Sequence, residues 1–312
     1  MPLSWKSARA ALVVAHPSHE LRVHGWLEKT RPYVCILTDG GGRSGEPRLA
    51  RTSEVLARVG ATQGAIFGRL GDLEVYSAIL NGNSELFAAL AEELAQAFVD
   101  EQIEYVVGDA TEGYSVAHDI CRVMIDAAVD LAERRHGHRV ANFDFLVVGP
   151  PDECPAELRN DSIRIELDDQ TFGRKVMAAL SYSPKLAVDV EAALAGAPFQ
   201  GVKRFSEPQL AGEIDIELID SVNEELESRP ALKARIKDIV EGVPIEDFRV
   251  ECLRPATQAA TDEFPFYELY GEKLVAAGRY DTVIRYREHM LPLTEAVRAA
   301  VEREEHWVRS AS

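Results

Sequence analysis

Short apolar runs alternate with helical patterns along the first half of the chain. The clearest run, residues 10–15, is rich in Ala and Val and stops abruptly at His16. Similar runs predict further strands at residues 32–37, 64–70, 105–107 and 143–148. Between them, apolar positions recur at helical spacing over residues 20–29, 48–59, 84–100 and 117–135. This alternation predicts a Rossmann-like α/β fold, a mostly parallel sheet with helices on both faces.

The pattern changes in the second half of the chain. Residues 163–167 alternate apolar and charged side chains, as an edge strand does, and a helix is expected over residues 171–182. Beyond about residue 190, helical segments predominate; they are expected at residues 214–227, 231–241 and 267–304. We therefore expect an α/β domain at residues 1–190 and a mainly helical C-terminal extension, residues 191–312, packed on it.

Polar loops follow four of the expected strands, at residues 16–20, 38–43, 71–72 and 109–119. The carboxyl ends of parallel strands meet at one edge of a sheet, where α/β proteins bind their ligands. His16, His19 and His118 can therefore lie together. Three neutral imidazoles with one open position form a common catalytic zinc site. The alternative is that the three are ordinary strand-end and helix-start residues, because the spacing His-x-x-His is a weak pattern by itself.

Charge and cysteine spacing narrow the set of partners and compartments. The net charge is −18, with 52 acidic and 34 basic residues, which argues against a nucleic-acid partner. No apolar run has the length of a signal peptide core or a membrane span. The four cysteines are far apart, which is typical of a reduced protein in the cytoplasm. A homo-oligomer is compatible with this sequence.

Several motifs resemble those of one enzyme family. His16-Pro17-Ser18-His19-Glu20 after an apolar strand is similar to the signature Ala-His-Pro-Asp-Asp-Glu of the LmbE/PIG-L-like zinc-dependent N-deacetylases. The resemblance spans roughly residues 8–185, and its further matches are Thr38-Asp39-Gly40, Arg51 with Glu54, Asp72, residues 112–119 and residues 175–182. It implies the same fold and a zinc-dependent amide hydrolase.

Carried over by position, the family's zinc ligands fall on His16, His19 and His118, with His19 in place of an aspartate. Zinc is the implied cofactor, although three histidines also suit iron or another divalent ion. The family's general base falls on Ser18, which cannot take a proton from water near neutral pH, and a second-motif histidine falls on Ser115. Asp39 is the first choice as a replacement base, ahead of Asp119 and Glu20. Predicted substrate contacts are Arg51, Asp72, Tyr114 and Ser115.

The sequence thus predicts a metal-dependent hydrolase that removes an N-acetyl group from a small molecule. The resemblance implies an N-acetyl amino sugar such as N-acetylglucosamine, or its conjugate, as the substrate. Two alternatives stay open. One is a metal- or sugar-binding descendant of the deacetylase fold that no longer hydrolyses amides, because position 18 has no general base. The other is a three-histidine metal centre of different reactivity.

Overall fold

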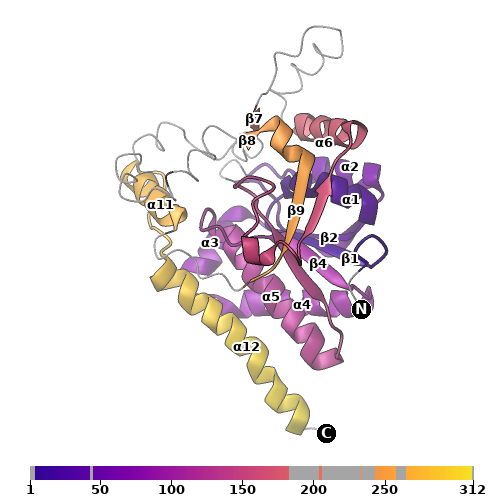
Figure 1. Ribbon diagram of the computed structural model, residues 1–312. Helices are drawn as coiled ribbons and strands as arrows, with labels where there is room; N and C mark the ends of the chain where they lie inside the picture. The colour runs from indigo at the N-terminus through magenta and orange to yellow at the C-terminus, as the bar shows by residue number, and fades with distance from the viewer. Residues whose placement is uncertain are drawn as a thin grey trace.

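The structure is a computed structural model that describes residues 4–42, 45–182, 204–205, 233, 243–257 and 265–310, with side chains to residue 302. Within these residues the main sheet has seven strands in the order β3-β2-β1-β4-β5-β9-β6 (Figure 1). The strands are β1 (Ala10–Val14), β2 (Tyr33–Thr38), β3 (Thr62–Leu70), β4 (Tyr105–Asp109), β5 (Ala141–Phe145), β6 (Ile163–Glu166) and β9 (Val250–Pro255). β1 to β5 are parallel, which confirms the predicted α/β class.

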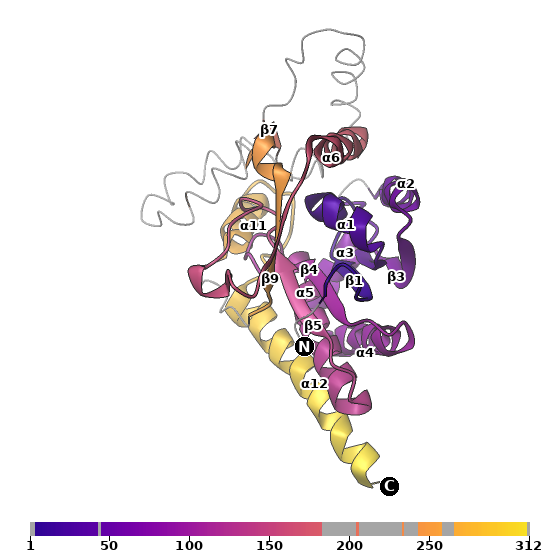
Figure 2. The ribbon, with the colours of Figure 1, turned by 45° about the vertical axis from the view of Figure 1, so that its right-hand side comes forward.

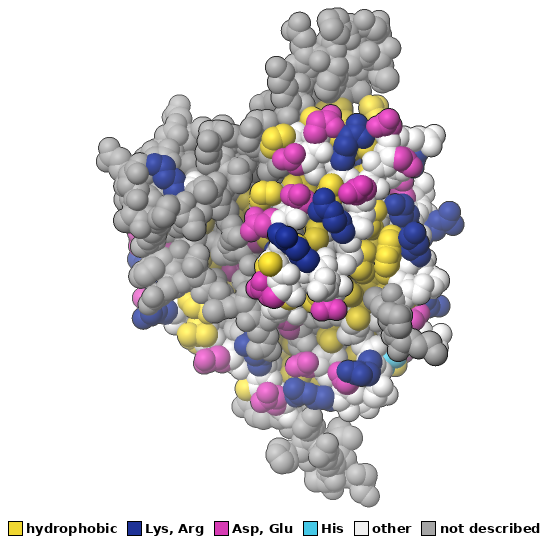
Figure 3. All heavy atoms as spheres, viewed as in Figure 1, with side chains coloured by type: hydrophobic (Ala, Val, Ile, Leu, Met, Phe, Trp, Pro, Cys, Tyr) yellow, Lys and Arg dark blue, Asp and Glu magenta, His cyan; other side chains and the backbone are white. Residues whose placement is uncertain are grey.

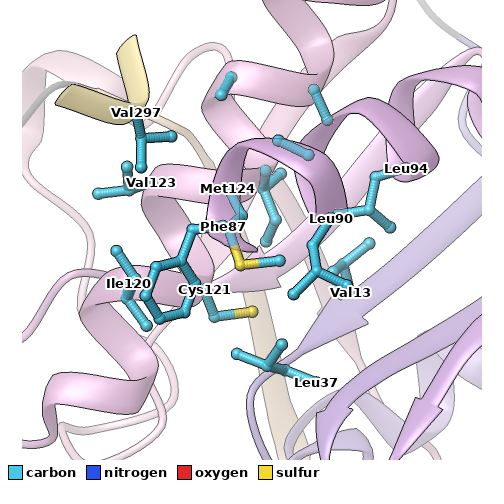
Figure 4. Packing of buried hydrophobic residues seen from close by; sticks show 14 of the residues in the cluster. Val13, Leu37, Phe87, Leu90, Leu94, Ile120, Cys121, Val123, Met124 and Val297 are labelled. Atoms are coloured by element: carbon cyan, nitrogen blue, oxygen red, sulfur yellow. The ribbon is translucent and has the colours of Figure 1, made fainter. Parts of the chain in front are cut away.

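Strand β1 lies in the middle of the sheet and is buried on both faces. Its side chains alternate between two apolar cores: Leu12 and Val14 enter one, and Ala11 and Val13 enter the other. An apolar run without polar alternation is what such a doubly covered parallel strand requires. Figure 4 shows the second core, in which Val13 lies near side chains of two helices.

Helices cover both faces of the sheet. The first core is covered by η1 (His19–Val23), α1 (His24–Thr30), α2 (Leu49–Val59) and α6 (Asp169–Tyr182). The second core is covered by α3 (Asp72–Leu80), α4 (Ser84–Asp100), α5 (Val116–His136) and α12 (Leu291–Ser310). Figure 2 shows α12 running beside α5, so this helix of the C-terminal region packs on the core. The remaining elements are η2 (Ala156–Leu158), β7 (Arg204–Phe205), β8 (Val243–Pro244), η3 (Ile245–Arg249), α11 (Phe266–Ala276) and η4 (Tyr286–Met290).

Strand β9 departs from the expectation of a mainly helical C-terminal region. It pairs antiparallel with both β5 and β6, so residues far along the chain complete the sheet. The segment was missed because Glu251 and Arg254 interrupt its apolar pattern, yet the Glu251 side chain is buried. The domain division at residue 190 stays a prediction.

The helices differ from the predictions in three further places. The helix expected at residues 20–29 begins at His19 as the 3₁₀ helix η1 and continues as α1. Helix α3 has no counterpart among the expected helices. The expected helix at residues 267–304 is broken between α11 and η4. The expected helices at residues 214–227 and 231–241 lie outside the described residues, apart from Lys233.

Strand β5 ends at Phe145, three residues before the end of the predicted strand, and Glu112 holds the chain that follows it. The Glu112 carboxylate accepts hydrogen bonds from the N–H groups of Val147, Val148 and Gly149. The guanidinium of Arg22 donates to the carbonyl oxygens of Leu146 and Gly149. These bonds satisfy a buried irregular segment that the sheet does not pair.

The outer surface carries both signs of charge. The face in Figure 3 shows Lys and Arg side chains interspersed with Asp and Glu. Of the helices in the described residues, none combines the length and the apolar character that crossing a bilayer demands.

Candidate metal centre

The three predicted histidines lie where the chain order of the sheet reverses. From β1 the chain proceeds to β2 and β3 on one side, and then returns to β4 on the other side of β1. His16 and His19 follow the carboxyl end of β1, and His118 lies in the first turn of α5, just after β4. Because β1 and β4 are hydrogen-bonded neighbours, these loops meet at the switch point that α/β sheets use for ligands.

All three imidazole rings are buried and contact one another. The ring centroids of His16 and His19 are 5.3 Å apart, those of His16 and His118 are 5.2 Å apart, and those of His19 and His118 are 4.6 Å apart. Each ring meets the others edge to face. The structure therefore brings together residues that are about a hundred positions apart in the sequence.

Two buried carboxylates orient two of these rings. His16 Nδ1 lies 2.8 Å from Thr38 Oγ1 and 3.0 Å from Asp72 Oδ1. His19 Nδ1 donates to Asp109 Oδ2 at 2.9 Å, and the same oxygen accepts the N–H of Ala15 at 2.7 Å. A carboxylate on one ring nitrogen fixes the tautomer and leaves Nε2 as the ligating atom, as in many zinc sites.

Two of the three rings carry a buried nitrogen without a hydrogen-bond partner in the described residues. These nitrogens are His19 Nε2 and His118 Nδ1, and no atom in the part of the chain that the structure describes pairs with them. Buried polar atoms are nearly always paired, so these two nitrogens are candidates to bind a metal ion or a water molecule. Rings bound tetrahedrally to zinc have centroids about 5 Å apart, close to the spacing here. Three imidazoles are a donor set that suits zinc. Among the described residues, however, no group of three or more His, Cys, Asp or Glu side chains is arranged so that it could hold a metal ion as it stands.

Burial keeps two of the rings neutral. Desolvation lowers the pKa of His19 and of His118 well below the usual range, and the neighbouring imidazoles lower both further. Burial by itself would raise the pKa of Asp72, but its hydrogen bond and charge interaction with His16 outweigh burial and lower it. Burial raises the pKa of Asp109, against the opposing effect of His118. Neutral imidazole is the form that binds a metal ion.

The turn that carries His16 and His19 is held in a strained conformation. Ser18 has φ 92°, a left-handed value that non-glycine residues rarely adopt. Its N–H donates to Glu20 Oε2 at 2.8 Å. Glu20 Oε1 in turn accepts the hydroxyl of Tyr182 at 2.8 Å. Glu20, considered above as a replacement base, is therefore engaged in holding this turn.

The two aspartates predicted to act on protons lie in different surroundings. Asp39 is half-buried, and its Oδ1 accepts the N–H of Gly41 at 2.8 Å within its own loop. Asp119 is buried beside His118, and its Oδ1 accepts the N–H groups of Glu112 and Gly113, both at 3.3 Å. Their roles as bases stay predictions.

The predicted substrate contacts differ in what they touch. The carboxylate of Asp72 pairs with His16 through Oδ1, and its Oδ2 accepts a hydrogen bond from the N–H of Gly42 at 2.5 Å. Tyr114 lies beside His118, with ring centroids 5.8 Å apart. The Ser115 hydroxyl accepts the N–H of Ala117 and caps α5. Arg51 donates to the carbonyl oxygens of Ser181 and Tyr182 at the end of α6.

Sequence reasoning missed the role of Asp109. Its position was already inside the loop expected to line the site, directly after a buried strand. What could not be seen is that β1 and β4 are neighbours in register, which puts Asp109 against His19 and Ala15. In the sequence, only an aspartate at the end of a buried strand marks this position. Such an aspartate is too common to indicate a contact with a particular histidine.

Two solved structures resemble this chain in overall arrangement. One is the crystal structure of the A40926 pseudoaglycone deacetylase Dbv21, with 16% identity and a TM-score of 0.42 over 82% of this chain and 99% of that chain. The other is the zinc-inhibited form of teicoplanin deacetylase Orf2, with 11% identity and a TM-score of 0.37 over 81% of this chain and 100% of that chain. No protein-family model and no curated protein matches the sequence. At TM-scores below 0.5, neither structure decides the activity of this chain.

Proposed function

We propose that this chain is a metal-dependent amide hydrolase that removes an N-acetyl group from a small molecule, an N-acetyl amino sugar or its conjugate. The observation that carries the proposal is the convergence of three buried imidazoles with unpartnered nitrogens on His19 and His118. The resemblance of the motif around His16 to that of the zinc-dependent N-deacetylases supports the reaction type.

In this proposal His16, His19 and His118 hold zinc, with Asp72 and Asp109 fixing two of the rings. Zinc in such a site activates water and polarises the acyl carbonyl. Asp119 handles the proton that leaves the water and the proton that the amine needs, with Asp39 as the alternative. Asp119 is favoured because its carboxylate is buried beside a ligand, whereas Asp39 turns into its own loop. Tyr114, beside His118, borders the substrate.

A specific observation favours a second candidate, a metal-binding module without hydrolysis. The family's base position is occupied by Ser18, and Glu20 is committed to the Ser18 N–H and to Tyr182. Losing a positioned base typically lowers a rate by about 10²–10⁴-fold. In this second candidate function, the chain binds zinc and the sugar but hydrolyses the N-acetyl group at a negligible rate.

Acetate release distinguishes the two candidates. The full chain, loaded with zinc, is incubated with N-acetylglucosamine and with its alkyl and aryl glycosides, and acetate and free amine are both measured. The proposal expects stoichiometric formation of both products by the wild type and none by the His118→Ala variant. Tight zinc binding with no product from any of these compounds would overturn hydrolysis and leave the second candidate.

A further inference from the structure

Helix α11, from the part of the chain that the family resemblance does not cover, lies against the loop that leads to His118. The N–H of Tyr267 donates to the carbonyl oxygen of Gly113 at 3.2 Å. The ring of Phe266 stacks on that of Tyr114, with centroids 5.6 Å apart and planes 3° apart. The ring of Tyr270 continues the stack beyond Phe266 at 5.4 Å. α11 is thus joined to the loop between β4 and α5 by a backbone bond and an aromatic stack.

The phenol of Tyr267 is buried in this contact and is not satisfied. Its side chain is among the buried residues of the second core, and its hydroxyl has no hydrogen-bond partner in the described residues. Burial raises the pKa of Tyr267, and the carboxylate of Asp119 raises it further, ahead of Glu268 and Tyr286. The phenol therefore keeps its proton and has a hydrogen-bond donor to offer.

Among the charged groups, Asp119 acts most strongly on the Tyr267 phenol, so it is the acceptor to consider for that hydrogen bond. Its Oδ1 is held by the N–H groups of Glu112 and Gly113 at 3.3 Å, near the long limit of a hydrogen bond. Gly113 thus joins the two residues, because its N–H faces Asp119 and its carbonyl oxygen accepts the N–H of Tyr267. Hydrogen bonds of catalytic groups are often long or poorly aligned before the site's ligands are bound, and we expect this one to be closed in the zinc-loaded chain.

We propose that Tyr267 is a positioning residue of the site: its hydroxyl donates to the Asp119 carboxylate and orients that group toward the substrate. The proposal rests on the proposed function, in which Asp119 handles protons. It makes α11 the third segment of the site, after the loops that follow β1 and β4. The donor comes from outside the family motif, in which the second-motif histidine has been replaced by Ser115.

Kinetics of matched variants test the positioning role. Tyr267→Phe removes one oxygen and keeps the ring, so the fold is retained, which circular dichroism verifies. We expect kcat to fall about tenfold with KM and zinc affinity unchanged, and no further fall when Tyr267→Phe is added to Asp119→Asn. Tyr270→Phe, which loses a hydroxyl on the same helix, is expected to leave kcat unchanged. Additive effects of the two substitutions would overturn the proposal.

A thermodynamic cycle tests the same contact without any hydrolysis. The free energies of unfolding of the wild type, Tyr267→Phe, Asp119→Asn and the double variant are measured in urea on the zinc-loaded chain. We expect a coupling clearly different from zero, because the two groups share one hydrogen bond. Zero coupling would overturn the positioning role even if acetate release is observed. Non-zero coupling in a chain that releases no acetate would instead show that only the proposed function has failed.

Discussion

Two buried polar clusters of this molecule differ in how completely they are satisfied. In the first, Glu251 of β9 accepts hydrogen bonds from the N–H groups of Gly25 and Trp26 and from Lys175 Nζ, at 2.7–2.8 Å. Lys175 Nζ also donates to the carbonyl oxygen of Arg22 at 2.7 Å. Both charges are fully buried, and each has a partner of opposite sign. This cluster ties β9, α1 and α6 together, and it is complete without a ligand.

The histidine cluster is equally buried but incomplete. Asp109 pairs with His19, and Asp72 pairs with His16. Three buried atoms, His19 Nε2, His118 Nδ1 and Asp109 Oδ1, nevertheless have no hydrogen-bond partner among the described residues. Burying unpaired polar atoms is unfavourable, so a fold retains them where a ligand will pair them. Buried polar groups therefore indicate a ligand-binding site only where the protein leaves some of their polar atoms without hydrogen bonds.

The largest expected effect is a loss of stability when the fully paired cluster of Glu251 and Lys175 is broken. Lys175→Met leaves Glu251 as an unpaired buried charge, so the free energy of unfolding should fall by about 3–5 kcal/mol. The control is Arg174→Met, which removes a half-exposed ion pair to Glu28 and should cost about 0–1 kcal/mol. Urea unfolding of both variants measures the difference, and zinc affinity should be unchanged in both. Equal stability losses would contradict the contrast between the clusters.

The next effect concerns the base position of the histidine cluster. Ser18→Asp introduces the carboxylate that the zinc-dependent N-deacetylases, whose motif this sequence resembles, have at the corresponding position. Aspartate tolerates the left-handed backbone at this position better than most residues. If the site hydrolyses amides slowly for want of this base, kcat/KM should rise by about 10²–10⁴-fold. Ser18→Asn, of the same shape but unable to take the proton, is the control. A similar rate for both variants would show that another carboxylate already serves as the base.

A smaller effect is expected from removing a carboxylate behind a ligand. Asp109→Asn should weaken zinc binding by about 10–100-fold, because His19 loses the partner that fixes its tautomer. The corresponding change behind His16, Asp72→Asn, should act in the same direction. Competition with a chelating dye measures both affinities. Unchanged zinc affinity in Asp109→Asn would mean that His19 is not a ligand.

The sequence predicted much of the sheet and the three histidines, and the reasons are local. The apolar run that ends at His16 indicates a buried parallel strand, β1. His118 follows another buried strand, β4, which pairs with β1 in the sheet. Strand β9 was not predicted because Glu251 has the charge of a surface residue. It is buried because Lys175 pairs with it, and this pairing is not visible in the sequence. The substrate contact of Arg51 stays a prediction. The sequence could not reveal that its guanidinium also donates to the end of α6, more than a hundred residues away in the sequence. Pairings of this kind depend on the completed fold.

The most direct measurement is an anomalous difference map at the zinc absorption edge, from crystals of the full chain grown with one equivalent of zinc. The account predicts a single strong peak within bonding distance of the rings of His16, His19 and His118, which is lost in the His118→Ala variant. A well-ordered map with no peak among these three rings, or with zinc bound elsewhere, would contradict it.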